Sequence, residues 1–309
     1  MPGMKIMPFY EDESGTWTYL LADPDAKRAA IIDPVWAYDP VSGRTSRDFI
    51  DQPLAAATAQ GWTLDWVLET HAHADHLSAG ALIREETGAR IAIGQGIRAV
   101  QRNFRKVFNL ASLIPDGRQF DRLLTDGDRL EIGGLSLRSM ETPGHTSDCI
   151  TYLVGDAAFI GDTLFAPGYG TARCDFPGGD AGQLYESIQR LYALPGETRL
   201  HLCHDYPEKG AAPRHCVTVA QSRKENVHLR ADTPKAEFIA LRTARDATLG
   251  LPKLILPAIQ VNVWAGAPPP AEDNGCGYLK IPFNSSIERL LALDPAKLVV
   301  QGLDDPQSG

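Results

Sequence analysis

Residues 70–80 read THAHADHLSAG and come shortly after the apolar run LDWVL at 64–68. Three histidines and one aspartate fall within six positions of this stretch: His71, His73, Asp75 and His76. Histidine nitrogen and carboxylate oxygen are the usual protein ligands of zinc and of non-haem iron. His71 and His73 are two residues apart and point the same way on extended backbone, whereas Asp75 and His76 come off the following turn. The stretch therefore predicts two pairs of metal ligands facing one cavity.

The alternative interpretation of this stretch is a coincidence of histidines at a strand end, or histidines that pack in the core. A single HxH pattern would leave that alternative open. The whole chain has only 8 histidines in 309 residues, however, so three of them within six positions are improbable by chance. The density of histidine favours a metal site.

Three later motifs carry the same types of side chain. They are TPGHTSD at 142–148, IGDTLF at 160–165 and LCHDY at 202–206, and they offer His145, Asp162 and His204. Each motif alone is weak evidence, since His145 could be a turn histidine and Asp162 a helix cap. Together they repeat one design, in which an apolar strand is followed by a loop with a histidine or aspartate. This design predicts that all the candidate ligands lie along a single edge of the sheets.

Composition excludes several classes of partner. The formal net charge is -9 and the pI is about 5.4, which argues against general binding to nucleic acid or to anionic membranes, because both need a basic face. No apolar stretch approaches the roughly 18 residues of a membrane span, and the first residues, MPGMKIMPFYEDESGTW, do not resemble a leader. Five scattered cysteines without a CxxC pattern favour reduced thiols. These features predict a cytoplasmic protein with a small-molecule partner.

The pattern of apolar residues and turns predicts an α/β protein with two sheets and outer helices. The predicted strands are 16–23, 28–35, 63–70, 135–141, 149–155, 157–161 and 198–203. The predicted helical segments are 46–61, with Pro53 as a break or kink, 80–88, 180–194, 217–229 and 235–250. Leu184, Ile188 and Leu191 form the apolar face of one helix, with Asp180 as its cap. Residues 265–277 are predicted to be a surface excursion.

The motifs THAHADH, PGHT, GDTLF and CHDY, in this order over roughly positions 15 to 230, resemble those of the metallo-β-lactamase superfamily. The resemblance implies an αββα sandwich with the metal site at one edge. We expect a catalytic domain at 1–250 and a C-terminal extension at 251–309 packed on the same domain.

The binuclear zinc hydrolases of this superfamily, glyoxalase II among them, provide one implied ligand set. Their first site uses the HxH histidines and the PGH histidine, their second uses the DH pair and the late histidine, and the GD aspartate bridges the two. All of these positions are filled in this chain. Ligand identity therefore permits two zinc ions and hydrolysis of a thioester such as S-lactoylglutathione.

The flanking sequence is more similar to the ETHE1-like persulfide dioxygenases, in particular the bacterial ones. ARCDF at 172–176 resembles their G-R-T-D-F segment and departs from it at Ala172 and Cys174. The following LYES, and the later VNVWAG and YLKIPF, also resemble this branch more than the C-terminal domain of glyoxalase II.

This resemblance implies one Fe(II) per chain, held by His71, His145 and Asp162. Such a 2-His-1-carboxylate triad leaves open positions on iron for O2 and substrate. The remaining candidate ligands would then orient the triad and hold waters: His73, Asp75, His76 and His204. The implied reaction oxidises glutathione persulfide, or a similar small persulfide, with O2 to sulfite and thiol. The resemblance also implies a homodimer.

Three further residues are predicted to bind the substrate: Arg173, Asp175 and Tyr206. Arg173 is the candidate contact for a substrate carboxylate, because guanidinium pairs with carboxylate through two hydrogen bonds. The alternative for Arg173 is a structural ion pair with Asp175 or with a helix end. Tyr206 is either a hydrogen-bond donor to substrate or O2, or a buried packing residue. Cys174 is either reactive toward persulfide or a small inert core thiol.

A non-catalytic metal-binding or sensor module is the remaining alternative. A purely structural metal site is closed by its own ligands and does not need this surplus of histidines. The sequence therefore favours an enzyme.

Overall fold

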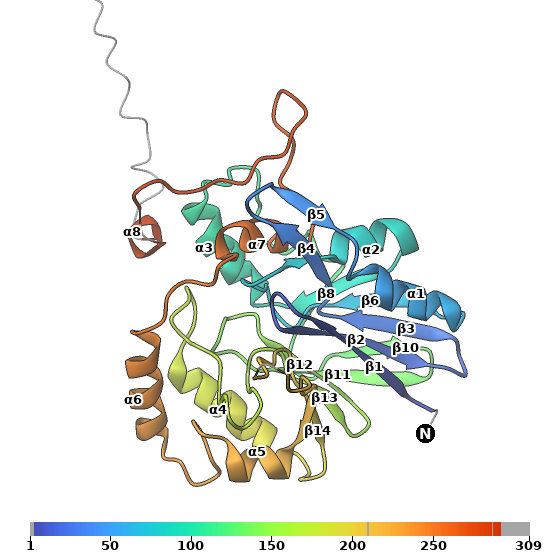
Figure 1. Cartoon of the computed structure of the whole chain (residues 1–309), viewed down its shortest axis with the longest axis vertical. Coiled ribbons are helices and arrows are strands. Elements are labelled where there is room, and N and C mark those ends of the chain that lie inside the picture. Colours follow the sequence, from blue (N-terminus) through green and yellow to red (C-terminus); the bar gives the residue numbers. More distant parts are fainter. Residues whose placement is uncertain (1–2, 209, 286, 292–309) are drawn as a thin grey trace, which may run out of the picture.

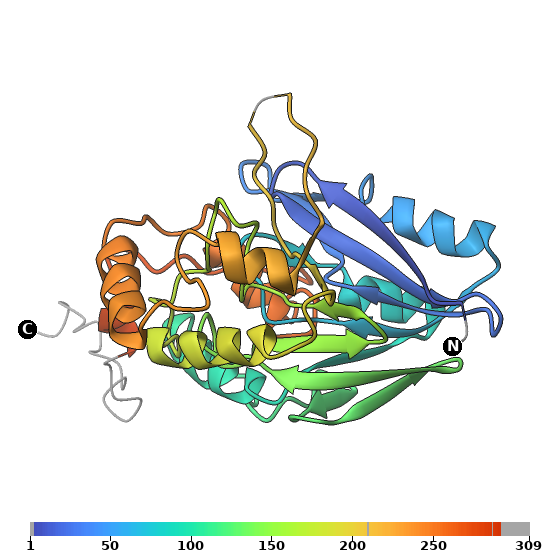
Figure 2. The same cartoon turned by 90° about the horizontal axis from the view of Figure 1, so that it is seen from below.

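Two six-stranded sheets stack face to face in the computed structural model, which describes residues 3–208, 210–285 and 287–291 (Figures 1 and 2). The strand order of the first sheet is β1-β2-β3-β6-β8-β9. Its strands are β1 (Lys5–Glu11), β2 (Thr16–Asp23), β3 (Arg28–Ile32), β6 (Thr63–Leu68), β8 (Arg90–Gly94) and β9 (Arg122–Leu124). From β3 to β9 the neighbouring strands are parallel, so the C-terminal ends of β3, β6 and β8 lie at the same edge of the sheet.

The second sheet has the order β10-β11-β12-β13-β14-β15. Its strands are β10 (Arg129–Ile132), β11 (Leu135–Glu141), β12 (Ile150–Val154), β13 (Ala157–Phe159), β14 (Arg199–His201) and β15 (Cys216–Thr218). A small third sheet consists of β5 (Arg44–Ser46), β4 (Val35–Asp39) and β7 (Leu77–Ser78). β7 follows the histidine-rich stretch directly and pairs with β4, which fixes the end of that stretch.

Helices cover the outer faces of both sheets (Figure 1). The first sheet is covered by α1 (Asp51–Ala59), α2 (Gly80–Thr87), α3 (Ile97–Val107) and α7 (Ile255–Asn262), with α8 (Ile287–Leu291) beside α3. The second sheet is covered by α4 (Ala181–Tyr192), α5 (Val219–Glu225) and α6 (Lys235–Asp246). The predicted α/β class and the αββα sandwich are therefore confirmed.

Strand β2 shows why the sheets stack in this way. All eight of its side chains are buried. Trp17, Tyr19 and Leu21 face the second sheet and join the apolar layer between the sheets, whereas Leu20 and Ala22 face the outer helices. Since side chains alternate between the two faces of a strand, a continuous apolar run is what a sheet covered on both faces requires.

Most of the predicted elements occur where the sequence places them. Gly88 ends α2 with a φ of 75°, a backbone conformation that glycine adopts without steric cost. The Asp180 side chain accepts a hydrogen bond from the backbone N–H of Gln183 at 2.7 Å and caps α4. Pro53 lies in the first turn of α1 and does not break it, because the first-turn N–H groups have no partner within the helix. The predicted helical segment 217–229 is partly wrong, since Cys216–Thr218 forms edge strand β15 before α5 begins.

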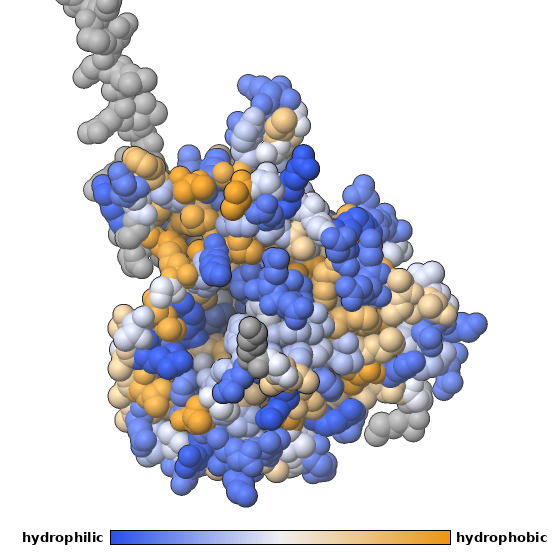
Figure 3. Space-filling model, viewed as in Figure 1, coloured by the Kyte–Doolittle hydropathy of each residue, from blue (hydrophilic) through white to orange (hydrophobic). Residues whose placement is uncertain are grey.

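The C-terminal part of the chain packs on the first sheet. Ile255, Ile259 and Val263 belong to the apolar cluster that also contains the buried face of α3. Residues 267–280 are mostly exposed and project as a loop (Figure 1). An apolar patch in Figure 3 follows the segment after this loop, where Ile281 and Phe283 are 74% and 86% exposed. The predicted boundary at 250 stays a prediction, and residues 292–309 lie outside the described residues. Within the described residues, no helix combines the length and apolar character needed to cross a membrane.

Candidate metal centre

The loop after β6 carries His71, His73, Asp75 and His76, and side chains from distant segments hold its backbone. Asp33, at the end of β3, accepts a hydrogen bond from the Thr70 N–H at 2.8 Å. Asp148 accepts one from the Ala72 N–H at 2.8 Å. The amide of Asn262 on α7 donates to the carbonyl oxygens of His73 and His76. These contacts fix an irregular backbone, because buried N–H and C=O groups need partners.

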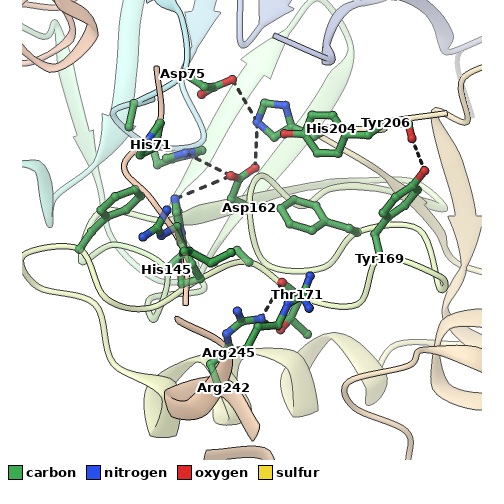
Figure 4. Close-up of a pocket in the computed structure, with 17 residues that line it drawn as sticks. His71, Asp75, His145, Asp162, Tyr169, Thr171, His204, Tyr206, Arg242 and Arg245 are labelled. Atoms are coloured by element: carbon green, nitrogen blue, oxygen red, sulfur yellow. Dashed lines mark hydrogen bonds and ion pairs between the residues drawn. The ribbon is translucent and has the colours of Figure 1, made fainter. Parts of the chain in front are cut away.

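His71, His145 and Asp162 converge on one cavity (Figure 4). The Nε2 atoms of His71 and His145 lie 4.0 Å and 3.7 Å from the same oxygen of Asp162, Oδ2. The ligand atoms of the three residues all lie within 4.8 Å of one another. These separations are too long for hydrogen bonds, but they suit an ion between them, because ligand atoms sit only about 2.0–2.2 Å from zinc or a similar metal.

Hydrogen bonds on the far side of each imidazole direct its free nitrogen into the cavity. The Thr70 hydroxyl donates to Asp33 at 2.9 Å and lies 3.1 Å from Nδ1 of His71, so its oxygen accepts the Nδ1–H. Nδ1–H of His145 donates to the carbonyl oxygen of Arg173 at 2.7 Å. Both Nε2 atoms therefore keep a lone pair toward Asp162. Burial, followed by the neighbouring histidines, holds the pKa of His71 well below its usual value, which keeps the ring neutral as a metal ligand must be.

Gly144, just before His145, permits the close approach of this motif to α4. Its φ is 140°, and a Cβ at this position would lie 2.3 Å from the backbone nitrogen of Leu184. Only glycine fits between these two backbones. The glycine of the PGH motif therefore has a structural role, because it lets the backbone before His145 lie against α4.

A second group of ligand-type side chains adjoins the triad. Nε2 of His204 lies 3.3 Å from Asp162 Oδ1 and 3.6 Å from Asp75 Oδ2. The contact with Asp162 is not aligned as a hydrogen bond, so Oδ1 has no hydrogen-bond partner among the described residues. His73, Asp75 and His76 also bring their ligand atoms within 4.8 Å of one another. All seven predicted metal-site residues therefore lie together at one edge of the sandwich.

Two imidazole nitrogens in this second group are buried without a hydrogen-bond partner in the described part of the chain, Nδ1 of His73 and Nε2 of His76. The other nitrogen of each ring is occupied. His73 Nε2 contacts Asp33 Oδ1 at 3.0 Å, and His76 Nδ1 donates to the carbonyl of Leu77. Buried polar atoms without partners are unfavourable, so the donor set fits a bound metal ion.

Cys203 and Glu69 also line the buried side of this group, and the sequence prediction did not include them. Cys203 forms a possible ligand set with His73 and His204, and Glu69 forms another with Asp33 and His73. Burial raises the pKa of Glu69 to about 7. Asp33 in particular serves three groups, since it holds Thr70, His73 and, at 3.7 Å, the Cys203 thiol.

The predicted substrate residues lie beside the same cavity. Arg173 pairs with Asp175 through two hydrogen bonds of 2.6 Å and donates a third to the carbonyl of Gly250 at 2.7 Å. The structural ion pair, which was the alternative for Arg173, is therefore formed. Asp175 is occupied by the same ion pair, so neither side chain is free in this conformation.

Tyr206 and Cys174 have different surroundings. Tyr206 is 50% exposed and stacks on His204 with 5.9 Å between ring centroids, so its interpretation as a buried packing residue is wrong. Tyr169 donates its hydroxyl hydrogen to the carbonyl of Tyr206. Cys174 is buried, and burial together with the nearby Asp246 raises its pKa to about 12. Its thiol is therefore protonated at neutral pH, as expected for an inert core residue.

A buried ion pair on α6, absent from the sequence prediction, holds the loop that carries Arg173. Arg242 and Asp246 are four residues apart and pair at the inner face of the helix. Arg242 also donates to the carbonyl of Thr171 at 3.1 Å, and Asp246 accepts from the N–H of Cys174 at 2.9 Å. This pair brackets the Arg173 carbonyl that orients His145. The i, i+4 spacing is a sequence signal, but the sequence does not show that the pair faces inward.

The cavity at this edge has a volume of about 280 Å³. Its lining comprises five ligand-type groups, aromatic and apolar side chains, and three arginines: His71, Asp75, His145, Asp162, His204, Ala74, Phe165, Tyr169, Thr171, Ala172, Arg173, Phe176, Tyr206, Arg242, Arg245, Leu249 and Pro252. The arrangement combines a metal-type donor set with access from solvent. An αββα sandwich with this cluster at its edge defines a metal-dependent enzyme fold.

The chain belongs to the metallo-β-lactamase superfamily, whose family model matches residues 12–204. It is 50% identical over 293 residues to a probable metallo-hydrolase from Burkholderia pseudomallei, covering 91% of this chain and 100% of that protein. It is 44% identical over 283 residues to glyoxylase B2 from Dictyostelium discoideum, covering 91% and 97%. The resemblance predicted from the motifs is thus confirmed at the level of the superfamily.

Similarity also extends to persulfide dioxygenases. The chain is 31% identical over 204 residues to the human mitochondrial persulfide dioxygenase ETHE1, covering 65% of this chain and 68% of that protein. The crystal structure of ETHE1 from Myxococcus xanthus matches with a TM-score of 0.68 and 33% identity, covering 85% of this chain and 100% of that one. The relatives therefore include proteins named as hydrolases and as a dioxygenase.

Proposed function

We propose that this chain is a mononuclear Fe(II) persulfide dioxygenase that oxidises glutathione persulfide, or a similar small persulfide, with O2. The products are the thiol and sulfite, with two oxygen atoms from O2 and the third from water. The observation that carries the proposal is the convergence of two imidazoles and one carboxylate on an open cavity. The match over the full length of the Myxococcus ETHE1 structure supports it.

In this proposal His71, His145 and Asp162 hold the iron. Thr70 and the Arg173 carbonyl fix the tautomers of the two histidines, so that both Nε2 atoms face the metal. When bound, Fe(II) supplies the redox chemistry by which O2 oxidises the terminal sulfur of the persulfide. Phe176 packs edge-on against His145, and Phe165 packs edge-on against His204. These rings give the ligand-bearing end of the cavity apolar walls that limit the access of water.

His204, Asp75, His73 and His76 have supporting roles in this proposal. His204 lies between the carboxylates of Asp162 and Asp75, and its Nδ1 lies 3.3 Å from the Thr16 hydroxyl. It is therefore positioned to orient Asp162 and to exchange a proton with a water in the cavity. The Tyr206 hydroxyl, on the ring stacked against His204, is the proposed donor to substrate or O2. A homodimer and a cytoplasmic location are further expectations of this proposal.

A binuclear zinc thioester hydrolase is the second candidate, and a specific observation favours it. His73 Nδ1, His76 Nε2 and Asp162 Oδ1 are buried without hydrogen-bond partners in the described structure, and a second metal ion would satisfy such atoms. The glyoxylase and metallo-hydrolase names of two relatives are consistent with this candidate. Metal-bound hydroxide is the nucleophile that two-zinc sites supply to a carbonyl.

Activity assays with matched metal forms test the proposal. Iron-loaded and zinc-loaded protein are each given glutathione persulfide, with O2 uptake and sulfite as readouts, and S-lactoylglutathione, with thioester loss as readout. We expect O2 uptake and sulfite from the iron form in equal amounts. Thioester cleavage by the zinc form, with no O2 uptake by the iron form, would establish the hydrolase instead.

A further inference from the structure

The three arginines that line the metal cavity differ in how their guanidinium groups are used. Arg242 is buried, pairs with Asp246 and donates to Thr171. Arg173 pairs with Asp175 and donates to Gly250. Arg245 is exposed, and no hydrogen bond or ion pair joins its side chain to any other residue in the ranges that the structure describes. Arg245 is therefore the cavity arginine that is free to bind a ligand.

The position of Arg245 in the cavity is the second part of the argument. Figure 4 shows Arg242 and Arg245 together beyond Thr171, on the side of the cavity away from Asp75 and His204. Burial and the positive charges of Arg242 and Arg245 lower the pKa of the neighbouring His228 to about 4. Arg242 and Arg173 are neutralised by Asp246 and Asp175, so Arg245 is the lining arginine whose positive charge is not compensated by an ion pair, in a chain whose net charge is -9. An anion near Arg245 would gain the local attraction that the rest of the surface does not provide.

Apolar side chains also line the cavity. Phe165, Phe176 and Leu249 line the cavity together with the ligand group and Arg245. A matching ligand has a sulfur atom at the metal end, a short apolar linker and an anionic group at the other end. Arginine recognises carboxylate through paired hydrogen bonds, and its planar donor geometry suits that group.

We propose that Arg245 binds a carboxylate of the substrate and selects carboxylate-bearing thiol persulfides over neutral ones. This inference rests on the proposed function, and it moves the carboxylate contact from Arg173, which is already paired, to Arg245 on the last turn of α6. Lysine at this position keeps the charge but lacks the paired donors. Alanine removes both.

Direct binding tests this proposal without turnover. The probes are S-methylglutathione, which carries the carboxylates and cannot form a persulfide, and its diethyl ester. Calorimetry with the metal-loaded protein is expected to show about tenfold weaker binding of S-methylglutathione to Arg245→Ala, and an intermediate loss for Arg245→Lys. The diester should bind wild type and Arg245→Ala with equal affinity. Lys224→Ala, an exposed cation on α5 outside the cavity, is the matched control and should change neither affinity.

Equal affinity of wild type and Arg245→Ala for S-methylglutathione would overturn the proposal. The proposal would also be overturned if S-methylglutathione did not bind wild type. It would equally be overturned if Arg245→Ala lost the same affinity for the diester as for S-methylglutathione. Circular dichroism of both Arg245 variants checks that they are folded. O2 uptake with glutathione persulfide is measured separately. A charge-dependent loss of binding without O2 uptake would support Arg245 and contradict the dioxygenase activity.

Discussion

His204 at the metal centre and His201 in the interior lie three residues apart at the end of β14, and each is 2% exposed. His204 faces the carboxylates of Asp162 and Asp75 beside an open cavity. His201 packs between the rings of Tyr19 and Phe159, at centroid distances of 5.3 Å and 4.8 Å. Neither nitrogen of His201 has a hydrogen-bond partner among the described residues. Burial alone therefore does not identify a functional histidine, whereas convergence with carboxylates on a cavity does.

Replacing a histidine at the metal centre should have the largest effect. His71→Ala removes one of the three proposed iron ligands, so we expect loss of iron binding and activity at background. His76→Ala should retain most of the metal and lose roughly 10- to 100-fold in activity, the usual cost of changing a group that supports a ligand. Iron per chain by elemental analysis and O2 uptake measure both effects. His201→Phe should retain the iron. Loss of iron in this variant would contradict the distinction between His201 and His204.

The ion pair of α6 should have the next largest effect. Asp246→Asn leaves the buried Arg242 guanidinium without its counter-charge, which costs about 3–5 kcal/mol when one partner of a buried pair is removed. We expect a lower free energy of unfolding, measured with urea, and weaker iron binding because the loop that orients His145 is released. Asp175→Asn breaks a partly exposed pair and serves as control. An equal loss of stability in both variants would show that burial does not distinguish the two pairs.

The Thr70 hydroxyl should have a smaller effect, confined to the metal centre. Thr70→Val removes the link between His71 and Asp33 at nearly constant volume. We expect roughly tenfold weaker metal binding, because the tautomer of His71 is no longer fixed. Thr58→Val on the exposed side of α1 is the matched control. Unchanged metal affinity in Thr70→Val would show that the Thr70 hydroxyl does not orient His71 for metal binding.

The interior histidine should give the smallest effect, and one that depends on pH. Burial lowers the pKa of His201 to about 3, whereas an unfolded histidine has a pKa of about 6.5. Between these values the unfolded state binds a proton that the folded state does not. The contribution of neutral His201 to the free energy of unfolding is therefore fully present above about pH 6.5, and it is lost as the pH is lowered toward 3. His201→Phe should gain about 1 kcal/mol over wild type on going from pH 7.5 to pH 5.5, measured by urea unfolding at each pH. If the difference in unfolding free energy between the two proteins were the same at both pH values, the lowered pKa of His201 would be contradicted.

Local patterns in the sequence predicted two sheets with outer helices and a common edge for the candidate ligands, and the resemblance of the motifs implied the αββα sandwich. The apolar strand 63–68 ends in the histidine-rich loop, and its parallel neighbours bring the loops that follow them to the same edge. The supporting contacts were not predicted. Asp33, Asp148 and Asn262 hold the histidine-rich loop from positions far away in the chain, and no short motif marks them. Their roles depend on tertiary packing.

The substrate end of the cavity was predicted less well for the same reason. Arg173 was chosen from its motif, but its partner two residues away occupies it in the structure. Arg245 belongs to a helix whose periodic pattern does not show which of its cations faces the cavity. Residue type and spacing predicted a cluster of candidate metal ligands, which the fold brings together, whereas the free or paired state of an arginine depends on the whole fold.

The most direct test of the central claim measures the metal content and the activity of the same protein sample. The purified chain is analysed for iron and zinc per chain, and the same sample is assayed for O2 uptake with glutathione persulfide. The account predicts about one iron per chain and O2 uptake that scales with iron content across partly loaded samples. Two zinc ions per chain, with thioester cleavage and no O2 uptake at any iron content, would contradict it.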